Sequence, residues 1–385
     1  MTMARGKVAA HTQSVLAGES PEGAIELVSG LQRTVLAGIW LLAAAVALVA
    51  IPAAASAAVP GYFAVDFISD NAGWVAGSDA TVLATVNGGK AWQTPATTPG
   101  GAPLLDICVL PDGRTGWAVG AAGTVLRTTD GKSWTRVFSS AFNASYSYTS
   151  VRFVDARTGW IAGGVAAGPF QGTPAGAILR TTDGGLTWSP AAASSGWCPV
   201  ALDAVSASSA VCAGVLRVNG SNAPAVVRTN NGSTWSAPAL LRPAAGATSE
   251  VGGLAMSATK AGANVVAVGD YCELLPPTPF AFSSTTAGTA FAYLAGPRTG
   301  PTQLRGVSLT SATAGFAVGT GANAVLQTTT GGASWTALSS PLAKNLQAVD
   351  FTSATTGYAV GRTAAGTAPV ILKTTTGAAS WTAVK

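Results

Sequence analysis

A short motif, Gly-aromatic-x-x-Gly, recurs along the sequence at nearly regular spacing. Clear copies start at Gly73, Gly116, Gly159, Gly315 and Gly357, and two weaker copies end at Gly214 and Gly269. Each copy is followed by an apolar run and a Thr-rich turn that closes on an aromatic residue: Trp92, Trp134, Trp188, Trp235, Phe291, Trp335 and Trp381. Repetition at one spacing indicates a chain of similar small units, each burying its faces against its neighbours.

The pattern within one unit predicts four short strands. In the last unit we expect strands at 346–351, 358–360, 370–374 and 381–384, with turn residues between them. No window shows a helical period long enough to compete. Seven such units predict an all-β, seven-bladed β-propeller of four-stranded antiparallel blades over 62–385. The expected blades are 62–97, 101–140, 147–193, 199–242, 250–296, 303–340 and 345–385.

An N-terminal signal or anchor segment is expected before the propeller. Residues 1–33 form a short polar lead, and the segment 34–58 contains no charged residue. Arg33 precedes the apolar run, as expected for an N-terminus kept in the cytoplasm, and Ala55-Ser56-Ala57 resembles a signal-peptidase site. Both a cleaved signal peptide and an uncleaved anchor fit, and either predicts an extracytoplasmic, secreted or outward-anchored protein.

The composition excludes several classes of function. Only 10% of the residues are charged, and no block of Lys and Arg suitable for a nucleic-acid backbone occurs. The single histidine, His11, precedes the apolar segment. Triads and metal sites that use histidine are therefore excluded from the propeller, and we predict neither a cofactor nor a metal.

The Thr-rich turn has a structural explanation. In the turn from Thr181 to Trp188, Asp183 can accept backbone N–H bonds, glycines permit positive φ, and the tryptophan can pack between sheets. This turn matches the Asp-box, or bacterial neuraminidase repeat. We assign a structural role to the matching residues Asp130, Asp183, Trp134, Trp188, Trp335 and Trp381.

One segment combines both motifs: it runs from Gly116-Trp117-Ala118-Val119-Gly120 through Thr128-Thr129-Asp130-Gly131 to Trp134. This segment resembles the photosystem II stability/assembly-factor-like propeller family. The resemblance covers about residues 62–385. It implies an exported scaffold that assists assembly of a membrane complex. Sialidases and sortilin-like receptors share the Asp-box, so that motif alone does not choose among them.

Loop lengths suggest where a binding site would lie. The extra residues of the longer units fall in loops on one face, which we call the top face, opposite the Asp-box turns. The candidate partner or ligand contacts in these loops are Tyr146, Tyr148, Phe170, Trp197, Tyr271 and Glu273. Arg152 and Arg305 are added as candidate basic contacts. Phe142 and Phe280 lie in the same loops. The alternative is that these aromatics fold under their own loops as local cores.

Two further sets of residues recur from unit to unit. Counting back from the Gly-aromatic motif gives one inner-strand position per blade: Asp66, Cys108, Arg152, Ser206, Ala255, Ser308 and Asp350. This ring either lines a channel that binds a small polar ligand or satisfies backbone bonds between blades. A basic stripe at the end of the third strands either contacts acidic partners or is solvated: Arg127, Arg180, Arg228 and Lys373.

The cysteines suggest one disulfide in an oxidising compartment. Cys108 and Cys212 fall in expected strands and are predicted to be buried thiols. Cys198 and Cys272 fall on loops of adjacent blades, and a bridge between them is the preferred hypothesis. A Cys198–Cys212 bridge is the alternative.

These observations favour a non-catalytic protein. A sialidase-like site needs a Tyr/Glu pair, an acid and three arginines, and the nearest match is Asp270-Tyr271-Cys272-Glu273 with Arg152, Arg298 and Arg305. No motif ties these residues together. We therefore predict a binding scaffold or assembly factor whose partner is an envelope or membrane protein. The alternatives are an extracellular glycan-binding module and an Asp-box glycosidase.

Overall fold

The structure is a computed structural model that describes residues 61–95, 98–99, 101–165, 174–241, 251–259, 264–271, 278–295, 301–321, 323–338, 345–363 and 365–385. The described residues form antiparallel strands and one 3-10 turn, Ser78–Ala80. The first strands are β1 (Tyr62–Phe67), β2 (Gly73–Gly77), β3 (Val82–Thr85), β4 (Leu104–Val109), β5 (Gly116–Gly120), β6 (Val125–Thr128), β7 (Thr135–Arg136), β8 (Ser147–Phe153), β9 (Gly159–Val165), β10 (Ala175–Thr181) and β11 (Ser189–Ser195). The remaining strands are β12 (Trp197–Ser206), β13 (Ser209–Val218), β14 (Ser221–Thr229), β15 (Ala239–Leu240), β16 (Val251–Ala258), β17 (Val265–Tyr271), β18 (Thr278–Ser284), β19 (Ala292–Ala295), β20 (Gln303–Leu309), β21 (Gly315–Thr320), β22 (Val325–Thr328), β23 (Thr336–Leu338), β24 (Asn345–Phe351), β25 (Gly357–Arg362), β26 (Pro369–Thr374) and β27 (Thr382–Ala383).

The prediction of an all-β propeller built from small antiparallel sheets is confirmed, but the strand pairing does not give seven separate blades. Five sheets are separate: β1–β3 with three strands, and β4–β7, β8–β11, β12–β15 and β16–β19 with four each. The remaining strands, β20–β27, form one eight-stranded sheet, because Thr320 pairs with Asn345 and joins two successive meanders. In the first sheet only an isolated bridge, Ala84–Gln93, stands where a fourth strand was expected.

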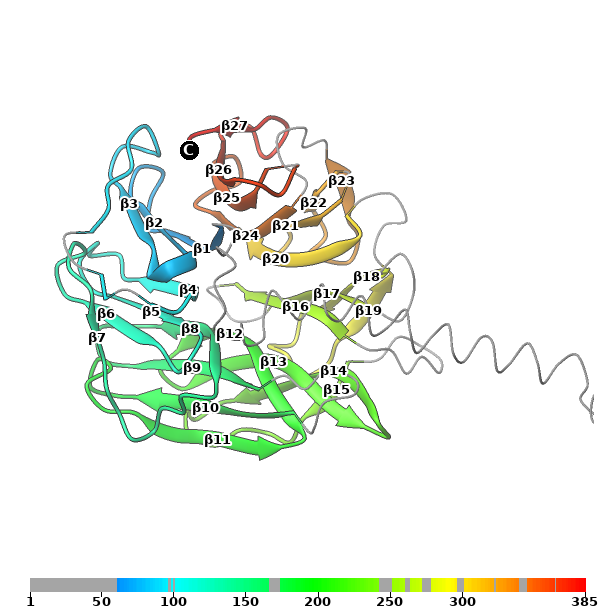
Figure 1. Cartoon of the computed structure of the whole chain (residues 1–385). Coiled ribbons are helices and arrows are strands. Elements are labelled where there is room, and N and C mark those ends of the chain that lie inside the picture. The colour runs from blue at the N-terminus through cyan, green and yellow to red at the C-terminus, as the bar shows by residue number, and fades with distance from the viewer. Residues whose placement is uncertain are drawn as a thin grey trace, which may run out of the picture. The chain divides into compact units, whose positions relative to one another are not determined.

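The sheets lie side by side around a common centre, with the first strand of each meander innermost (Figure 1). Contacts between these inner strands run in a closed circuit through β1, β4, β8, β12, β16, β20, β24 and back to β1. β1 pairs with β2, and β27 pairs with β26. No described strand is therefore exchanged to close the circuit, and closure depends on contacts between the first and last meanders, such as those of β1 with β24.

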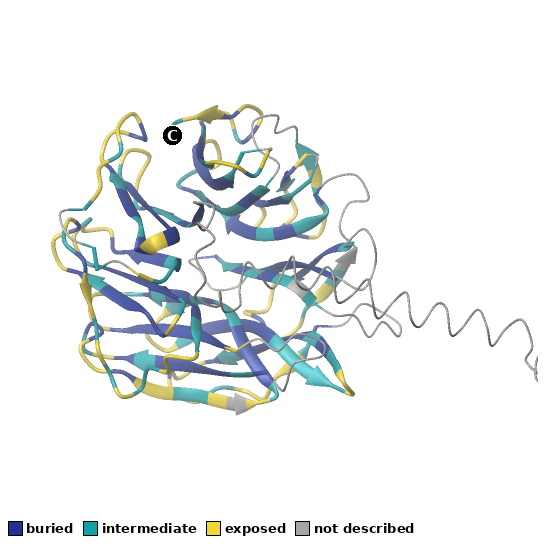
Figure 2. Cartoon of the chain, viewed as in Figure 1, coloured by how far each residue is buried: buried dark blue, intermediate teal, exposed yellow. Residues whose placement is uncertain are grey.

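Aromatic residues of the repeated motif join neighbouring meanders. Figure 2 shows buried residues running through the middle of the sheets: the second strands β2, β5 and β17 are buried along their whole length, whereas the outermost strands β7 and β27 are exposed. Trp117 of β5 stacks on Phe153 of β8 with ring centroids 3.3 Å apart. Equivalent stacks join Phe316 to Phe351 and Tyr358 to Phe67, the latter across the closure between the last and first meanders. Because each ring buries its area against the next meander, cohesion is distributed around the circuit.

The second glycine of the motif is explained by a close backbone approach. It faces a β-bulge in the inner strand, where the pairing register of that strand shifts. A Cβ placed on Gly319 would lie 1.7 Å from the carbonyl oxygen of Gln303, and one on Gly361 would lie 2.1 Å from that of Asn345. The same clash with an inner-strand carbonyl occurs at Gly77, Gly120, Gly163, Gly214 and Gly269. The second glycine of the motif is therefore explained by the short distance between the first and second strands of each meander.

The N-terminal lead and the apolar segment at 34–58 lie outside the described residues. Among the residues that are described, no helix combines the length and the apolar character needed to cross a bilayer. The prediction of a signal peptide or anchor stays a prediction.

Candidate functional site

Polar side chains of the inner strands link each meander to the next around the centre. Each accepts a backbone N–H from the neighbouring inner strand. Asp66 accepts from Val109 at 2.6 Å, and Asp350 accepts from Phe67 at 2.7 Å across the closure. The remaining acceptor and donor pairs are Asp106 with Val151, Ser150 with Leu202, Asp203 with Ala258, Ser257 with Leu309, and Ser308 with Phe351.

This circuit supports the structural alternative for the predicted inner ring and corrects two of its members. The residues opposite the motif's aromatic position include Asp203 and Ser257, not Ser206 and Ala255. In these two meanders a valine replaces the aromatic residue. Counting back from the motif therefore assigned the wrong residue to the inner-strand position. Cys108 and Arg152 hold the ring position without accepting the next N–H, and Asp106 and Ser150, two residues earlier, accept it instead.

Arg152 lies at the centre of a cluster of carboxylates. Its Nη1 is 2.9 Å from Oδ2 of Asp106, and its Nε is 3.8 Å from Oδ1 of Asp203. Burial and the nearby Asp350 raise the pKa of Asp66 to about 7, although the Val109 N–H and Arg152 oppose the shift. Burial also raises the pKa of Asp203, against the effect of Arg152. Burial alone would lower the pKa of Arg152, but Asp106 and Asp203 together raise it.

The polar side chains at this centre have a structural role. Each carboxylate that bonds the next strand is occupied by a backbone N–H, which stabilises its ionised form at a fixed position. Within the described ranges, no three His, Cys, Asp or Glu side chains converge as metal ligands. The carboxylate-to-backbone bonds link successive inner strands, and Asp106 and Asp203 hold the Arg152 guanidinium between them.

The predicted basic stripe bridges neighbouring meanders on the face of the Asp-box turns. Arg180 lies over the Trp160 ring and donates to Oγ of Ser233 and the carbonyl of Ala207 in the next meander. Lys373 lies over Tyr358 and donates to the carbonyl of Gly88, across the closure. Arg127 approaches the next Asp-box turn, since a Cβ on Gly184 would lie 3.6 Å from its Nη2. Arg228 is half-buried.

The Asp-box turns have the hydrogen bonds expected of a folding device. Asp183 accepts the N–H groups of Leu186 and Thr187, and Thr181 Oγ1 accepts that of Gly185. Bonds from Thr187 lower the pKa of Asp183 to about 2, and bonds from Ser133 and Lys132 do the same for Asp130. Trp134, Trp188 and Trp381 are buried, and Trp335 is half-buried.

We expect Asp183→Ala to lower the free energy of unfolding by about 1 kcal/mol, as for loss of a capping acceptor. Urea denaturation followed by circular dichroism measures this. Asp183→Asn is the matched control, because Asn231 already accepts the N–H groups of Ser233 and Thr234 in an equivalent turn. If Asn and Ala destabilise equally, the charge rather than the acceptor geometry is responsible.

Most of the predicted top-face aromatics lie in strands, not in loops, and pack into the core clusters formed by neighbouring sheets. Tyr148, Trp197 and Tyr271 are buried, as is Phe280. Tyr146 is half-buried and contacts Tyr148 edge to face, with ring centroids 6.4 Å apart. Arg305 is half-buried on β20. Phe170 and Glu273 lie outside the described residues, so the Tyr271/Glu273 pair of a sialidase-like site is not described.

The described cysteines are free thiols. Cys108, Cys198 and Cys212 are all buried, so the alternative Cys198–Cys212 bridge is not formed. Cys198 is unbridged, in contrast to the preferred pairing with Cys272, which lies outside the described residues. Burial raises the pKa of Cys108 and of Cys198 to about 12, and it also raises that of Cys212.

We expect these three thiols to resist iodoacetamide in the native protein at pH 8, because the reactive thiolate is suppressed and the sulfur atoms are buried. Intact mass before and after labelling measures this, with labelling in guanidinium chloride as the control. Labelling of Cys108, Cys198 or Cys212 in the native state within minutes would contradict the burial.

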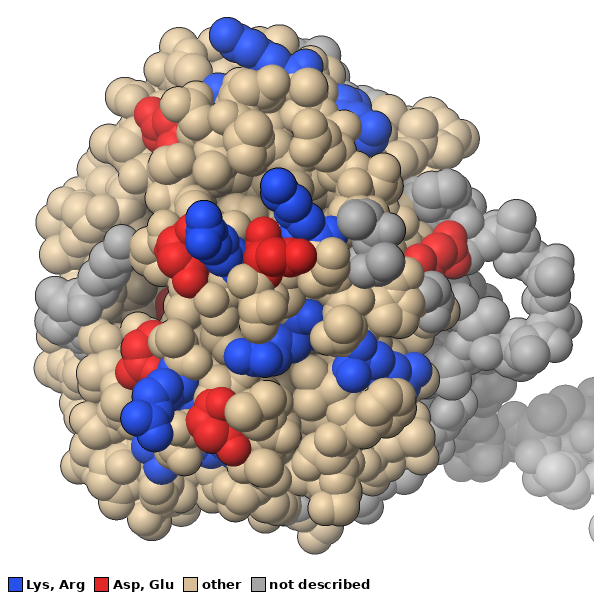
Figure 3. Space-filling view, turned by 90° about the vertical axis from the view of Figure 1, so that its left-hand side faces the viewer, with Lys and Arg blue, Asp and Glu red and all other residues tan. Residues whose placement is uncertain are grey.

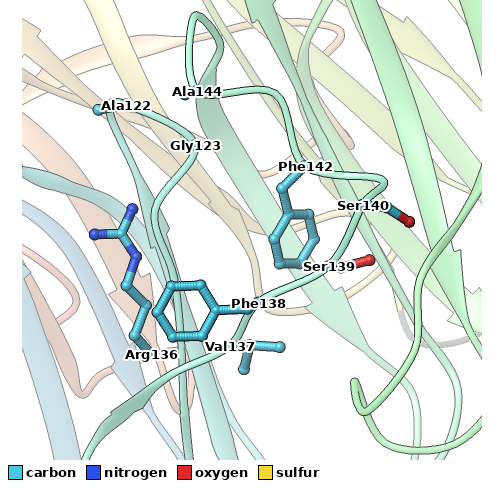
Figure 4. Close-up of a pocket in the computed structure, with 9 residues that line it drawn as sticks. All are labelled: Ala122, Gly123, Arg136, Val137, Phe138, Ser139, Ser140, Phe142 and Ala144. Atoms are coloured by element: carbon cyan, nitrogen blue, oxygen red, sulfur yellow. The ribbon is translucent and has the colours of Figure 1, made fainter.

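A pocket of about 400 Å³ opens on the top face beside β7 (Figure 4). The β5–β6 turn contributes Ala122 and Gly123, and the chain from β7 toward β8 contributes Arg136, Val137, Phe138, Ser139, Ser140, Phe142 and Ala144. Phe138 is 81% exposed, and the Arg136 guanidinium lies 5.8 Å from the centre of its ring. Neither residue was among the predicted contacts. Both follow the Asp-box tryptophan Trp134, at positions that do not match a motif repeated in the other units.

Charge on the neighbouring surface is sparse and mixed. Figure 3 shows Lys and Arg interspersed with Asp and Glu on one side of the molecule, among mostly uncharged side chains. No large field of one sign covers this side. Recognition on this side would therefore depend on local contacts rather than on long-range attraction.

Comparison with known proteins supports the sequence resemblance. Residues 57–141 match the family model described as photosynthesis system II assembly factor YCF48, and this segment contains most of the pocket. A search of curated proteins finds no match.

Solved structures share the fold. One described as "YCF48 bound to D1 peptide" has 18% identity and a TM-score of 0.57, covering 83% of this chain and 94% of its own. YCF48 from Cyanidioschyzon merolae has 16% identity and a TM-score of 0.56, covering 83% and 96%. A virginiamycin B lyase from Staphylococcus aureus has 12% identity and a TM-score of 0.56, covering 78% and 91%. The fold is therefore shared by proteins with different activities.

Proposed function

We propose that this chain, a β-propeller whose residues 57–141 match the photosystem II assembly-factor model, is a non-catalytic scaffold that binds a protein partner through its top face. The observation that carries the proposal is the pocket beside β7, which leaves Phe138 exposed within the segment that matches the family model. Exposed aromatic residues next to an arginine are typical of protein-binding surfaces. The peptide bound by the YCF48 relative is consistent with a protein partner here.

The proposal includes an extracytoplasmic location and a partner in the cell envelope. Its support is the uncharged segment at 34–58, with Arg33 before it and the Ala55-Ser56-Ala57 pattern after its apolar run. The proposal also treats the eight-stranded sheet as two blade units, which makes a ring of seven. β20–β23 and β24–β27 repeat the same meander, and among the described residues only Thr320 and Asn345 pair as strand residues between them.

Site-specific photocrosslinking in the cells that produce the protein tests this function. A photoreactive benzoylphenylalanine replaces Phe138, and in a control it replaces Val86, which is 74% exposed on the opposite, Asp-box face. We expect the probe at 138 to attach a defined envelope protein that the probe at 86 does not attach. Absence of a protein adduct at 138, or the same adducts at both positions, contradicts the proposed function.

A further inference from the structure

The pocket beside β7 has rigid walls. Gly123 donates its N–H to the carbonyl of Tyr146 at 2.8 Å, and a Cβ on Gly123 would lie 2.7 Å from the carbonyl oxygen of Asn143. Asn143 donates its N–H to the hydroxyl of the buried Tyr148. The β5–β6 turn is thereby attached to the linker that follows β7. A ligand would meet a preformed surface and lose little affinity to ordering these loops.

The two phenylalanines of the pocket have different roles. Phe142 is half-buried and contacts the Tyr148 and Trp188 rings at centroid distances of 5.9 and 6.1 Å, so its position is fixed by the core. Phe138 projects into solvent with 81% of its surface exposed. A ligand that covers this ring removes apolar surface from water, which favours binding. Leaving the ring exposed does not stabilise the fold.

The charge of the pocket is positive and uncompensated. Arg136 is its only charged lining residue, and within the described part of the chain its guanidinium makes no ion pair. Figure 4 shows the Arg136 side chain beside the Phe138 ring. Ser139 and Ser140 add two hydroxyl groups to the rim. A carboxylate next to an apolar side chain matches this arrangement, since guanidinium binds carboxylate through paired hydrogen bonds.

We propose that the pocket binds an acidic segment of the partner, in which an aromatic or large aliphatic side chain packs on Phe138 and an adjacent carboxylate pairs with Arg136. This inference rests on the proposed protein-binding function and specifies the chemistry of the segment. A neutral glycan is less well matched, because the lining has no carboxylate or side-chain amide to accept and orient sugar hydroxyls.

Selection from a displayed library of random peptides tests the chemistry without knowledge of the natural partner. The immobilised probe is the full chain, and the affinities of the most enriched synthetic peptides are measured by fluorescence anisotropy. We expect a consensus with an apolar residue next to Asp or Glu. Arg136→Gln should weaken binding about tenfold or more, and Phe138→Ala should weaken it similarly.

Two control variants separate local contacts from general effects. Arg136→Lys keeps the charge and should retain part of the affinity, whereas Val86→Ala alters an exposed residue on the opposite face and should leave affinity unchanged. A consensus without acidic residues, or peptide binding unaffected by Arg136→Gln, overturns the inference. Retention of the chain on a polysaccharide matrix that requires Phe138, with no peptide enriched, also overturns it.

The two tests fail in different ways. If the probe at 138 attaches an envelope protein but the selected peptides lack acidic residues, the scaffold function stands and the acidic-segment inference fails. If no protein is attached at 138, the proposed function fails, whatever peptides the library yields.

Discussion

Gly319→Ala is expected to destabilise the protein by about 3 kcal/mol or more. The added methyl group would lie 1.7 Å from the carbonyl oxygen of Gln303, which belongs to the neighbouring inner strand. Because both atoms are attached to backbone, neither a rotamer change nor a flexible side chain relieves the overlap. The inner strand must shift, and its bulge and its bonds to the next meander shift with it. Guanidinium denaturation followed by tryptophan fluorescence measures the loss.

Gly61→Ala is the matched control for this experiment. Its methyl group would lie 3.0 Å from Nε of Arg362, a side-chain contact that a shift of a few tenths of an ångström relieves. We expect a loss well below that of Gly319→Ala. Similar losses at both positions would show that glycine acts through general backbone effects and not through the approach of Gln303.

The fold could be predicted from the repeat motif because each residue of the motif has a structural role that recurs from unit to unit. The second glycine faces a carbonyl across the bulge, the aromatic residue stacks on the next inner strand, and the box Asp closes a turn. The expected strands of the last meander agree with β24–β27 within a few residues. Such short-range patterns can be read directly because their partners lie at fixed separations along the chain.

The candidate sites were less predictable because they depend on contacts between distant residues. Tyr148 and Trp197 were predicted to contact a partner, yet both lie in strands and are buried in core clusters. Phe138 followed an ordinary outer strand, and its 81% exposure depends on where the next linker runs. Likewise, nothing local in the sequence showed that Arg152 would meet Asp106 and Asp203 from two other inner strands.

Arg152→Met is expected to lower the free energy of unfolding by about 2–3 kcal/mol at pH 8. Loss of one partner from a fully buried ion pair costs roughly 3–5 kcal/mol. Here the Arg152 side chain is 34% exposed, so water screens part of the interaction and reduces the loss. The substitution keeps an apolar stem of similar length but leaves Asp106 and Asp203 facing one another without the cation. Urea denaturation across a range of pH values measures the effect.

The pH dependence of that loss distinguishes electrostatics from packing. The pKa of Asp66 is raised to about 7 in the folded protein, above its ordinary value of 3.8. The folded state therefore binds more protons between about pH 4 and 7, and the stability that Asp66 contributes below this window is lost as pH rises through it. Burial raises the pKa of Asp203 in the same direction.

Removal of Arg152 takes away a charge that favours the ionised form of both carboxyls, so their folded-state pKa values should rise further. The difference in unfolding free energy between wild type and Arg152→Met should be largest above pH 7. It should shrink as pH falls further below about 4, because the carboxyls then become protonated in the unfolded state as well as in the folded state. Asp130 and Asp183 are unchanged in the variant, so their effect at low pH cancels from the difference. Arg152→Lys, which keeps the charge, should recover part of the stability at pH 8. A loss of the same size at every pH would show that Arg152 acts by filling space.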